Sequence, residues 1–186
     1  AKTSLIHVGI DINLFVTLPS PLIYKDYFGL PADKFTIGFV GRLVSVKNPL
    51  AFISLAKELV KHKRNLHFVI AGDGILKNAV IQKIKSEGLE EYFTVLPWVA
   101  NIEKLLVCLD LLVMTSLNEG TPLILMEAMM MGIPVAATAV GGVPHLIEHE
   151  KSGFILTENS SANAIYLNEV IENYNSTILN IVPYAK

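Results

Sequence analysis

The sequence is poor in cysteine and in charge, and each scarcity excludes a class of protein. Its one cysteine, Cys108, rules out an intrachain disulfide and fits a reducing compartment. Because Cys108 lies in an apolar helical pattern, we expect a buried residue rather than a nucleophile. Charged residues make up 17% of the chain, against ~25% in typical soluble domains, and the net charge is −2. These values give no reason to expect nucleic acid or an anionic membrane surface as a partner.

Membrane spans, export signals and common nucleotide fingerprints are also missing. The longest uncharged window, residues 128–144, is broken by glycine and proline, so it is not expected to span a membrane. The chain opens on AKTSLIHVGID, without an initiator methionine or a basic region before an apolar run. We therefore expect a piece of a longer cytoplasmic protein, which would touch the inner face of a membrane only through its missing part. Neither a Walker A loop nor a G-x-G-x-x-G motif is found.

Short β-branched runs alternate with amphipathic segments from residue 35 onward. The predicted strands are apolar on both faces, as the buried strands of a parallel sheet are. Right-handed crossovers between them give an α/β fold, a doubly wound parallel sheet of Rossmann-like type with helices on both sides. Strands are predicted at 35–41, 66–74, 93–99, 111–116, 133–142 and 153–156, and helices at 48–63, 75–88, 101–110, 121–132 and 143–151.

We expect this Rossmann-like domain to occupy residues 35–157. Residues 1–34 are predicted to form an N-terminal segment and a linker, because the stretch LPSPLIYKDYFGLP is spaced by prolines. Residues 158–186 are predicted to be a C-terminal helical tail, with a possible final helix over 161–175.

Ligands of doubly wound sheets bind beyond the carboxyl ends of the strands. In this sequence the predicted strand ends are followed by glycines and charged residues that could bind a ligand. After the first strand, GFVGRLVSVKNP places Gly41, Arg42 and Lys47 in one loop before a helix. Two cations beside a helix N-terminus can clamp a diphosphate, although a solvated basic loop is an equal alternative. After the second strand, Gly72 and Gly74 either let a ligand approach the backbone or serve a turn that needs positive φ.

The fourth strand is followed by SLNEGTP and the start of a helix. The backbone amides over Gly120, Thr121, Pro122 and Leu123 would be free there to bind an anion. Glu119 precedes them, either as a ligand contact or as a surface carboxylate in a turn.

Two further features complete this edge of the sheet. Gly141 and Gly142 follow the fifth strand and again permit close backbone approach. Glu127 stands among apolar residues in the predicted helix, and burying an unpaired carboxylate costs roughly several kcal/mol. Glu127 therefore requires either a protein donor or a ligand hydroxyl. Taken together, the strand ends describe a site for a ligand with two phosphates and several hydroxyls.

The combination of GFVGRLVSVKNP, FVIAGDG and EGTPLILMEAMMMGIPVAATAVGGVPHLIEHEKSGFIL resembles a known family. It is similar to the C-terminal, donor-binding domain of retaining glycosyltransferases of family 4 (glycosyl transferases group 1), which are two-domain GT-B enzymes. The similarity runs over residues 5–157, and the E-x7-E pair of Glu119 and Glu127 is its most specific element. The resemblance implies that residues 35–157 bind a nucleotide sugar. It also implies transfer of a hexosyl or N-acetylhexosaminyl group to a glycan or lipid-linked acceptor bound by a missing N-terminal domain, without which this domain would be inactive.

The resemblance further implies roles for single residues. Arg42 and Lys47 would grip the donor diphosphate and stabilise the leaving nucleotide in place of a metal ion, so neither a metal nor another cofactor is expected. Glu119 would contact hydroxyls of the donor sugar, and Glu127 those of the ribose. The amides of residues 120–123 would receive a phosphate. The glycines at the strand ends would border the donor, and the loop that follows the third strand would lie near the base with Trp98 and Val99; the identity of the base stays open.

Two other functions remain open. A non-catalytic nucleotide-sugar-binding module with a regulatory role would share the fold and part of the site. The complete E-x7-E pair together with Arg42 and Lys47 favours transfer, because a purely structural copy has no physical need to keep them. A sugar-nucleotide 2-epimerase is the third choice, and a nicotinamide dehydrogenase is disfavoured by the missing glycine fingerprint.

Overall fold

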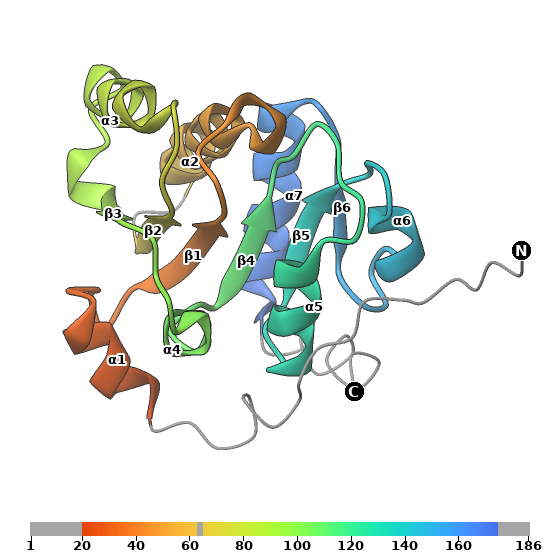
Figure 1. The fold of residues 1–186 in the computed structure, drawn as a ribbon, viewed down its shortest axis with the longest axis horizontal. Coiled ribbons are helices and arrows are strands. Elements are labelled where there is room, and N and C mark those ends of the chain that lie inside the picture. The colour runs from red at the N-terminus through yellow and green to blue at the C-terminus, as the bar shows by residue number, and fades with distance from the viewer. Residues whose placement is uncertain (1–19, 63–64, 175–186) are drawn as a thin grey trace, which may run out of the picture.

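The computed structural model describes residues 20–62 and 65–174, which form one parallel sheet between two layers of helices (Figure 1). The strand order is β3-β2-β1-β4-β5-β6, which is the doubly wound order of a Rossmann-like sheet. The predicted fold class is thereby confirmed. The strands are β1 (Phe35–Val40), β2 (Leu66–Ala71), β3 (Phe93–Leu96), β4 (Leu111–Met114), β5 (Val135–Thr138) and β6 (Phe154–Leu156).

Helices cover both faces of the sheet. One layer holds α2 (Pro49–His62), α3 (Lys77–Ser86) and α7 (Ser160–Glu172). The other holds α1 (Pro21–Tyr27), α4 (Ile102–Leu106), α5 (Leu123–Met130) and α6 (Val143–Leu146). Two 3-10 turns, η2 (Ser45–Lys47) and η3 (Glu90–Tyr92), complete the described elements. The chain changes from the first layer to the second after β3, so the topological switch point lies between the neighbouring strands β1 and β4.

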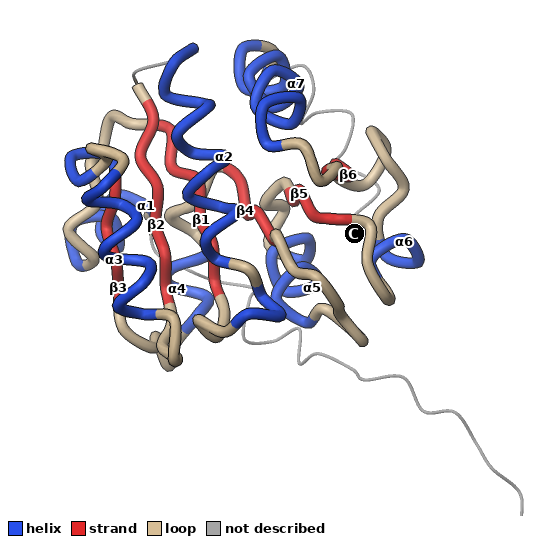
Figure 2. The backbone as a smooth tube through the Cα atoms, turned by 90° about the horizontal axis from the view of Figure 1, so that it is seen from above, coloured by secondary structure: helices blue, strands red, loops and turns tan. Residues whose placement is uncertain are grey.

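The alternation of side chains along the strands divides the core in two. Ile37 and Phe39 of β1 are buried against the α2 layer, where Phe52 packs with its ring centroid 5.7 Å from that of Phe39. Val69 of β2 is buried on the opposite face, against the layer of α4 and α5. Each such side chain contributes ~1.5–3 kcal/mol on burial. Figure 2 shows the sheet from above, with α2 lying over the strands. None of the described helices is long and apolar enough to cross a membrane.

Cys108 is a core residue, as predicted, although it lies in the turn that follows α4 and not in the helix. It is 1% exposed, and burial raises the pKa of its thiol to about 11. Because the thiolate is the reactive form, a thiol that stays protonated near neutral pH is a poor nucleophile.

The structure differs from the predicted division of the chain at its N-terminal side. The proline-spaced stretch predicted to be a linker contains α1, with Pro21 in its first turn and Ser20 as N-cap. The Ser20 hydroxyl accepts a hydrogen bond from the amide of Leu22 at 3.4 Å. Proline is favoured at the start of a helix, so this proline marks the beginning of a helix within the predicted linker.

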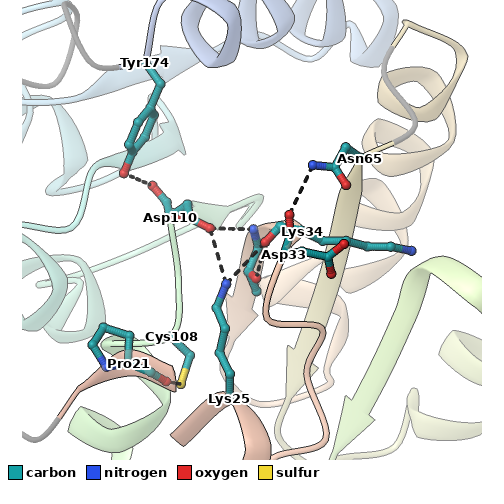
Figure 3. Close-up of polar contacts among 9 residues, drawn as sticks. Pro21, Lys25, Asp33, Lys34, Asn65, Cys108, Asp110 and Tyr174 are labelled. Atoms are coloured by element: carbon teal, nitrogen blue, oxygen red, sulfur yellow. Dashed lines mark hydrogen bonds and ion pairs between the residues drawn. The ribbon is translucent and has the colours of Figure 1, made fainter. Parts of the chain in front are cut away.

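A lysine of α1 binds the chain at the amino ends of β1 and β4 (Figure 3). Lys25 is only 7% exposed, and its Nζ donates to the carbonyl of Lys34 at 3.2 Å. The same Nζ lies 3.9 Å from Oδ2 of Asp110, which also accepts the amide of Thr36 at 2.7 Å. A buried ammonium with these partners fixes α1 beneath β1 and β4, so α1 belongs to the Rossmann-like domain.

The final helix is also part of the domain. It forms as α7, capped by Asn159, whose side chain accepts from the amides of the first turn at 3.0 Å. Leu167 and Ile171 are buried in the core beside α2, and the Tyr174 hydroxyl donates to the carbonyl of Asp110 at 2.9 Å (Figure 3). The domain therefore extends past the predicted boundary at residue 157. The remainder of the predicted tail, 175–186, and the predicted segment 1–19 lie outside the described residues.

Candidate functional site

The carboxyl ends of β1 and β2 open onto a pocket of about 440 Å³. The arrowheads of β1 and β4 in Figure 1 point towards this edge of the sheet. The lining comes from the loop between β1 and α2, the loop between β3 and α4, and the segment that leads into α5. The pocket brings together most of the predicted site residues: Gly41, Arg42, Lys47, Trp98, Val99, Glu119, Thr121, Pro122, Leu123 and Glu127.

An ion pair between Lys47 and Glu119 forms one wall of the pocket. The Lys47 Nζ lies 2.6 Å from Oε1 of Glu119, and the Ser116 hydroxyl donates to the same oxygen at 2.5 Å. The Glu119 side chain is only 7% exposed, so these two charge-assisted bonds stabilise a nearly buried carboxylate. Its other oxygen, Oε2, has no hydrogen-bond partner within the described ranges and is free to accept from a ligand. Arg42, by contrast, is exposed.

Hydrogen bonds between the loops that carry Lys47 and Glu119 keep these two side chains close together. Asn48 adopts a left-handed conformation, with φ of 49°, directly after η2. Its carbonyl accepts the Thr115 hydroxyl at 2.9 Å, and the amide of Leu117 donates to the carbonyl of Val46 at 2.8 Å. The loops that follow β1 and β4 are therefore bonded edge to edge.

Glycines allow neighbouring loops beside the pocket to pack backbone against backbone. The pocket lining leaves out five predicted residues: Gly72, Gly74, Gly120, Gly141 and Gly142. A Cβ at Gly141 would stand 1.6 Å from the carbonyl oxygen of Glu119, and one at Gly72 would stand 1.9 Å from that of Gly41. At these two positions the backbone of a neighbouring loop occupies the space of a side chain, so glycine is required there, and the approach of a ligand to them stays a prediction.

The start of α5 offers fewer free amides than predicted. The amide of Leu123 donates to the carbonyl of Thr121 at 3.0 Å, so for Leu123 the prediction is wrong; Pro122 has no N–H. The cause is a tight turn ahead of the helix, which a sequence pattern does not reveal. The amides of Gly120 and Thr121 have no partner in the part of the chain that the structure describes. Two donors and the positive end of α5 therefore remain for an anion.

Glu127 lines the pocket from α5 and is half-buried. Its carboxylate accepts no hydrogen bond from any described residue, so the donor that its burial requires is not supplied by this part of the protein. Burial raises the pKa of Glu127, and the like charge of Glu103 raises it further. A half-buried carboxylate without a protein donor is suited to accept hydrogen bonds from ligand hydroxyls.

Replacing Glu127 by glutamine is expected to raise the melting temperature near neutral pH. Because the pKa in the folded state lies above the ordinary value of 4.5, the folded state binds the proton more tightly than the unfolded state. The resulting stabilisation is complete below pH ~4.5 and is lost as pH rises through the raised pKa. The advantage of Glu127→Gln should therefore grow from acidic to neutral pH in thermal unfolding. Glu90→Gln, at an exposed position, is the control; an advantage independent of pH would contradict the assignment.

Trp98 and Val99 lie at the rim of the pocket, in the loop between β3 and α4. The Trp98 side chain is 68% exposed and also borders a side hollow of about 360 Å³ with Tyr27 and Phe28. A larger and more open hollow, of about 910 Å³, lies between α5 and α6 and contains none of the predicted site residues. No group of three or more His, Cys, Asp or Glu side chains within 20–62 and 65–174 could hold a metal ion.

Sequence reasoning missed several residues of this site. Val40 and Ala71 line the pocket as the last residues of β1 and β2, and a strict application of the strand-end rule would have found them. Ser116, which bonds Glu119, follows β4 and carried no signal beyond its place three residues before Glu119.

Comparison with known proteins supports the resemblance drawn from the motifs. The family model described as glycosyl transferases group 1 matches residues 23–185. The UDP-Gal:alpha-D-GlcNAc-diphosphoundecaprenol alpha-1,3-galactosyltransferase of Escherichia coli is 30% identical over 185 residues, a match that covers 97% of this chain and 47% of that enzyme. The chain therefore spans about half the length of this curated relative.

Solved structures show the same fold. HepE from Anabaena, in complex with UDP and glucose, superposes with a TM-score of 0.88 at 29% identity, over 98% of this chain and 50% of HepE. The C-terminal domain of the group 1 glycosyl transferase LpcC from Francisella tularensis superposes with a TM-score of 0.83 at 25% identity, over 95% of this chain and 94% of that domain. The chain thus belongs to the glycosyl transferases group 1, and its fold is that of the C-terminal Rossmann-like domain of GT-B glycosyltransferases.

Proposed function

We propose that this chain is the donor domain of a retaining glycosyltransferase and binds a nucleoside diphosphate sugar in the pocket at the strand ends. The observation that carries the proposal is the joint placement of Arg42, Lys47 and Thr121, whose amide is free, around one pocket with Glu127. The Glu127 carboxylate accepts no hydrogen bond from any described residue. UDP is the nucleotide that we propose, because HepE was crystallised with UDP and the Escherichia coli relative is named for UDP-Gal.

The charges of the pocket fit the changes that sugar transfer requires. Negative charge grows on the diphosphate as the bond to the sugar breaks, and Arg42, Lys47 and the N-terminus of α5 would stabilise it. The free Oε2 of Glu119 would accept hydrogen bonds from sugar hydroxyls near the anomeric carbon, where positive charge develops. In this arrangement the cations supply the stabilisation that a metal ion would otherwise give, so we propose a metal-independent reaction.

The remaining contacts follow from this placement. Glu127 would accept hydrogen bonds from the ribose, and Trp98 and Val99 would flank the base. The transferred group would be a hexosyl or N-acetylhexosaminyl residue. A glycan or lipid-linked acceptor would bind to a second domain, since the relatives are about twice as long as this chain. We place the whole enzyme in the cytoplasm, with membrane contact only through that second domain.

Titration calorimetry with UDP tests the proposed function. Arg42→Ala is expected to weaken binding about 10- to 100-fold, because a hydrogen bond to a charged group contributes ~1.5–3 kcal/mol. EDTA should change the affinity little. Lys85→Ala, an exposed cation on α3, is the matched control. The absence of any binding by UDP or UDP-sugars at millimolar concentration would refute the proposal, and loss of binding in EDTA would refute its metal-independent part.

A non-catalytic regulatory module and a sugar-nucleotide 2-epimerase remain the alternatives. All three functions predict UDP binding, so calorimetry does not separate them. Hydrolysis of the donor by the longer protein, abolished by Glu119→Ala, would support transfer over a purely binding role.

A further inference from the structure

Ser116 does not line the pocket and has been given no role in donor binding so far, yet it is bonded to Glu119, which has one. It is 1% exposed, follows β4, and donates its hydroxyl to Oε1 of Glu119 at 2.5 Å. We propose that Ser116 is a positioning residue that keeps the Glu119 carboxylate oriented towards the donor sugar after Lys47 has turned to the diphosphate. The proposal rests on the proposed function of donor binding.

The argument begins with the competition for Lys47. Its Nζ is bonded to Glu119 alone among the described residues. A diphosphate carries more negative charge than a carboxylate and offers several strong acceptor oxygens, so it draws the ammonium away from Glu119. Once Lys47 has moved, Ser116 is the remaining protein donor to Glu119 in the described part of the chain.

The position of the Ser116 hydroxyl is well determined. The carbonyl of Ser116 accepts the Thr138 hydroxyl at 2.6 Å from the end of β5. On its other side, the amide of Leu117 donates to Val46, in the loop that carries Lys47. The residue is thus held between the end of β5 and the loop that follows β1, and it is sheltered from water, which would otherwise compete for its hydrogen bond.

The geometry connects Ser116, through Glu119, with the sugar part of the ligand only. Its bond goes to Oε1, so it acts on the direction of Oε2, the oxygen that remains open to the pocket. Arg42, Glu127 and the amides before α5 have no bond to Ser116. The loss of the hydroxyl should therefore weaken recognition of the sugar and leave recognition of the nucleotide nearly unchanged.

The test compares UDP with UDP-sugars on the same variants by titration calorimetry. UDP-glucose, UDP-galactose and UDP-N-acetylglucosamine are screened on the parent chain, and the tightest is used. Ser116→Ala is expected to weaken binding of that UDP-sugar about five- to tenfold, while the affinity for UDP stays within ~2-fold. Ser116→Thr keeps the hydroxyl and should therefore restore the affinity of the parent chain for the UDP-sugar. Ser86→Ala, an exposed serine at the end of α3, is the matched control.

Two further variants keep the test decisive. In a Glu119→Gln background, Ser116→Ala should have no additional effect on the ratio of the two affinities. If Ser116→Ala unfolds, the isosteric Ser116→Cys, a weaker donor, should show an intermediate loss. An equal weakening of UDP and UDP-sugar, or no change in either, would overturn the role of Ser116 while leaving donor binding intact. Failure of the parent chain to bind UDP would overturn the proposed function and this role with it.

Discussion

Replacing Lys47 by alanine is expected to weaken UDP binding about 10- to 100-fold and to destabilise the free protein by ~1–3 kcal/mol. The binding loss follows from removal of a cation that lines the pocket. The stability loss follows because, among the described residues, the nearly buried Glu119 keeps only Ser116 as a donor. Calorimetry measures the first effect and chemical unfolding the second. Lys61→Ala is the control, since its 2.7 Å pair with Glu58 is exposed and such pairs contribute ~0–1 kcal/mol.

The double variant Lys47→Ala, Glu119→Gln separates the two effects. Glutamine removes the unpaired charge, so most of the lost stability should return, whereas UDP binding should stay weak because the cation is still missing. A Lys47→Ala variant as stable as the parent chain would show that the ion pair does not stabilise the fold. Recovery of UDP affinity in the double variant would show that Lys47 acts by neutralising Glu119 rather than by holding phosphate.

Replacing Gly141 by alanine is expected to destabilise the protein by ~2–5 kcal/mol. Gly141 has φ of +53°, a conformation that costs a non-glycine residue energy, and its new Cβ would stand 1.6 Å from the carbonyl oxygen of Glu119. The loop must therefore move, and the amide of Gly142 would lose its 3.1 Å hydrogen bond to the same carbonyl. Urea unfolding measures the effect.

The chain offers a matched control for this substitution. Gly120 lies in the loop that Gly141 and Gly142 touch, but a Cβ there would meet no heavy atom within 4 Å. Gly120→Ala should therefore change the free energy of unfolding by less than ~1 kcal/mol. Equal destabilisation by both substitutions would mean that close packing of the loops is not what requires glycine at residue 141.

The fold was predictable because its signals are local and repeated. Runs such as FTIGFV and LHFVIA are mostly apolar on both faces, which is typical of strands covered by helices on two sides. The pocket was predictable for a related reason: parallel strands bring their carboxyl ends to one edge, so Lys47 and Glu119 had to meet there although 72 positions separate them.

The errors arose where one loop depends on another. The proline-spaced stretch was predicted to be a linker, although Ser20 and Pro21 mark the start of a helix. The contacts of Lys25 that hold this helix in the domain include Asp110, which is distant in sequence. The carbonyls that lie against Gly72 and Gly141 belong to loops that are distant in sequence, so the contacts that require glycine there could not be predicted. The approach of a ligand to these two positions stays a prediction. The hydroxyl of Ser116 matters only through its contact with Glu119, which no pattern of spacing indicates.

The Lys47–Glu119 pair also bears on the speed of association. While the two side chains are 2.6 Å apart, their charges largely cancel at a distance, so the exposed Arg42 supplies the positive field that reaches the solvent on this side of the pocket. An approaching diphosphate would be steered by Arg42 and would reach the pocket while Lys47 is still paired with Glu119. Added salt should therefore slow the encounter through Arg42, whereas the residence time of the nucleotide depends on Lys47.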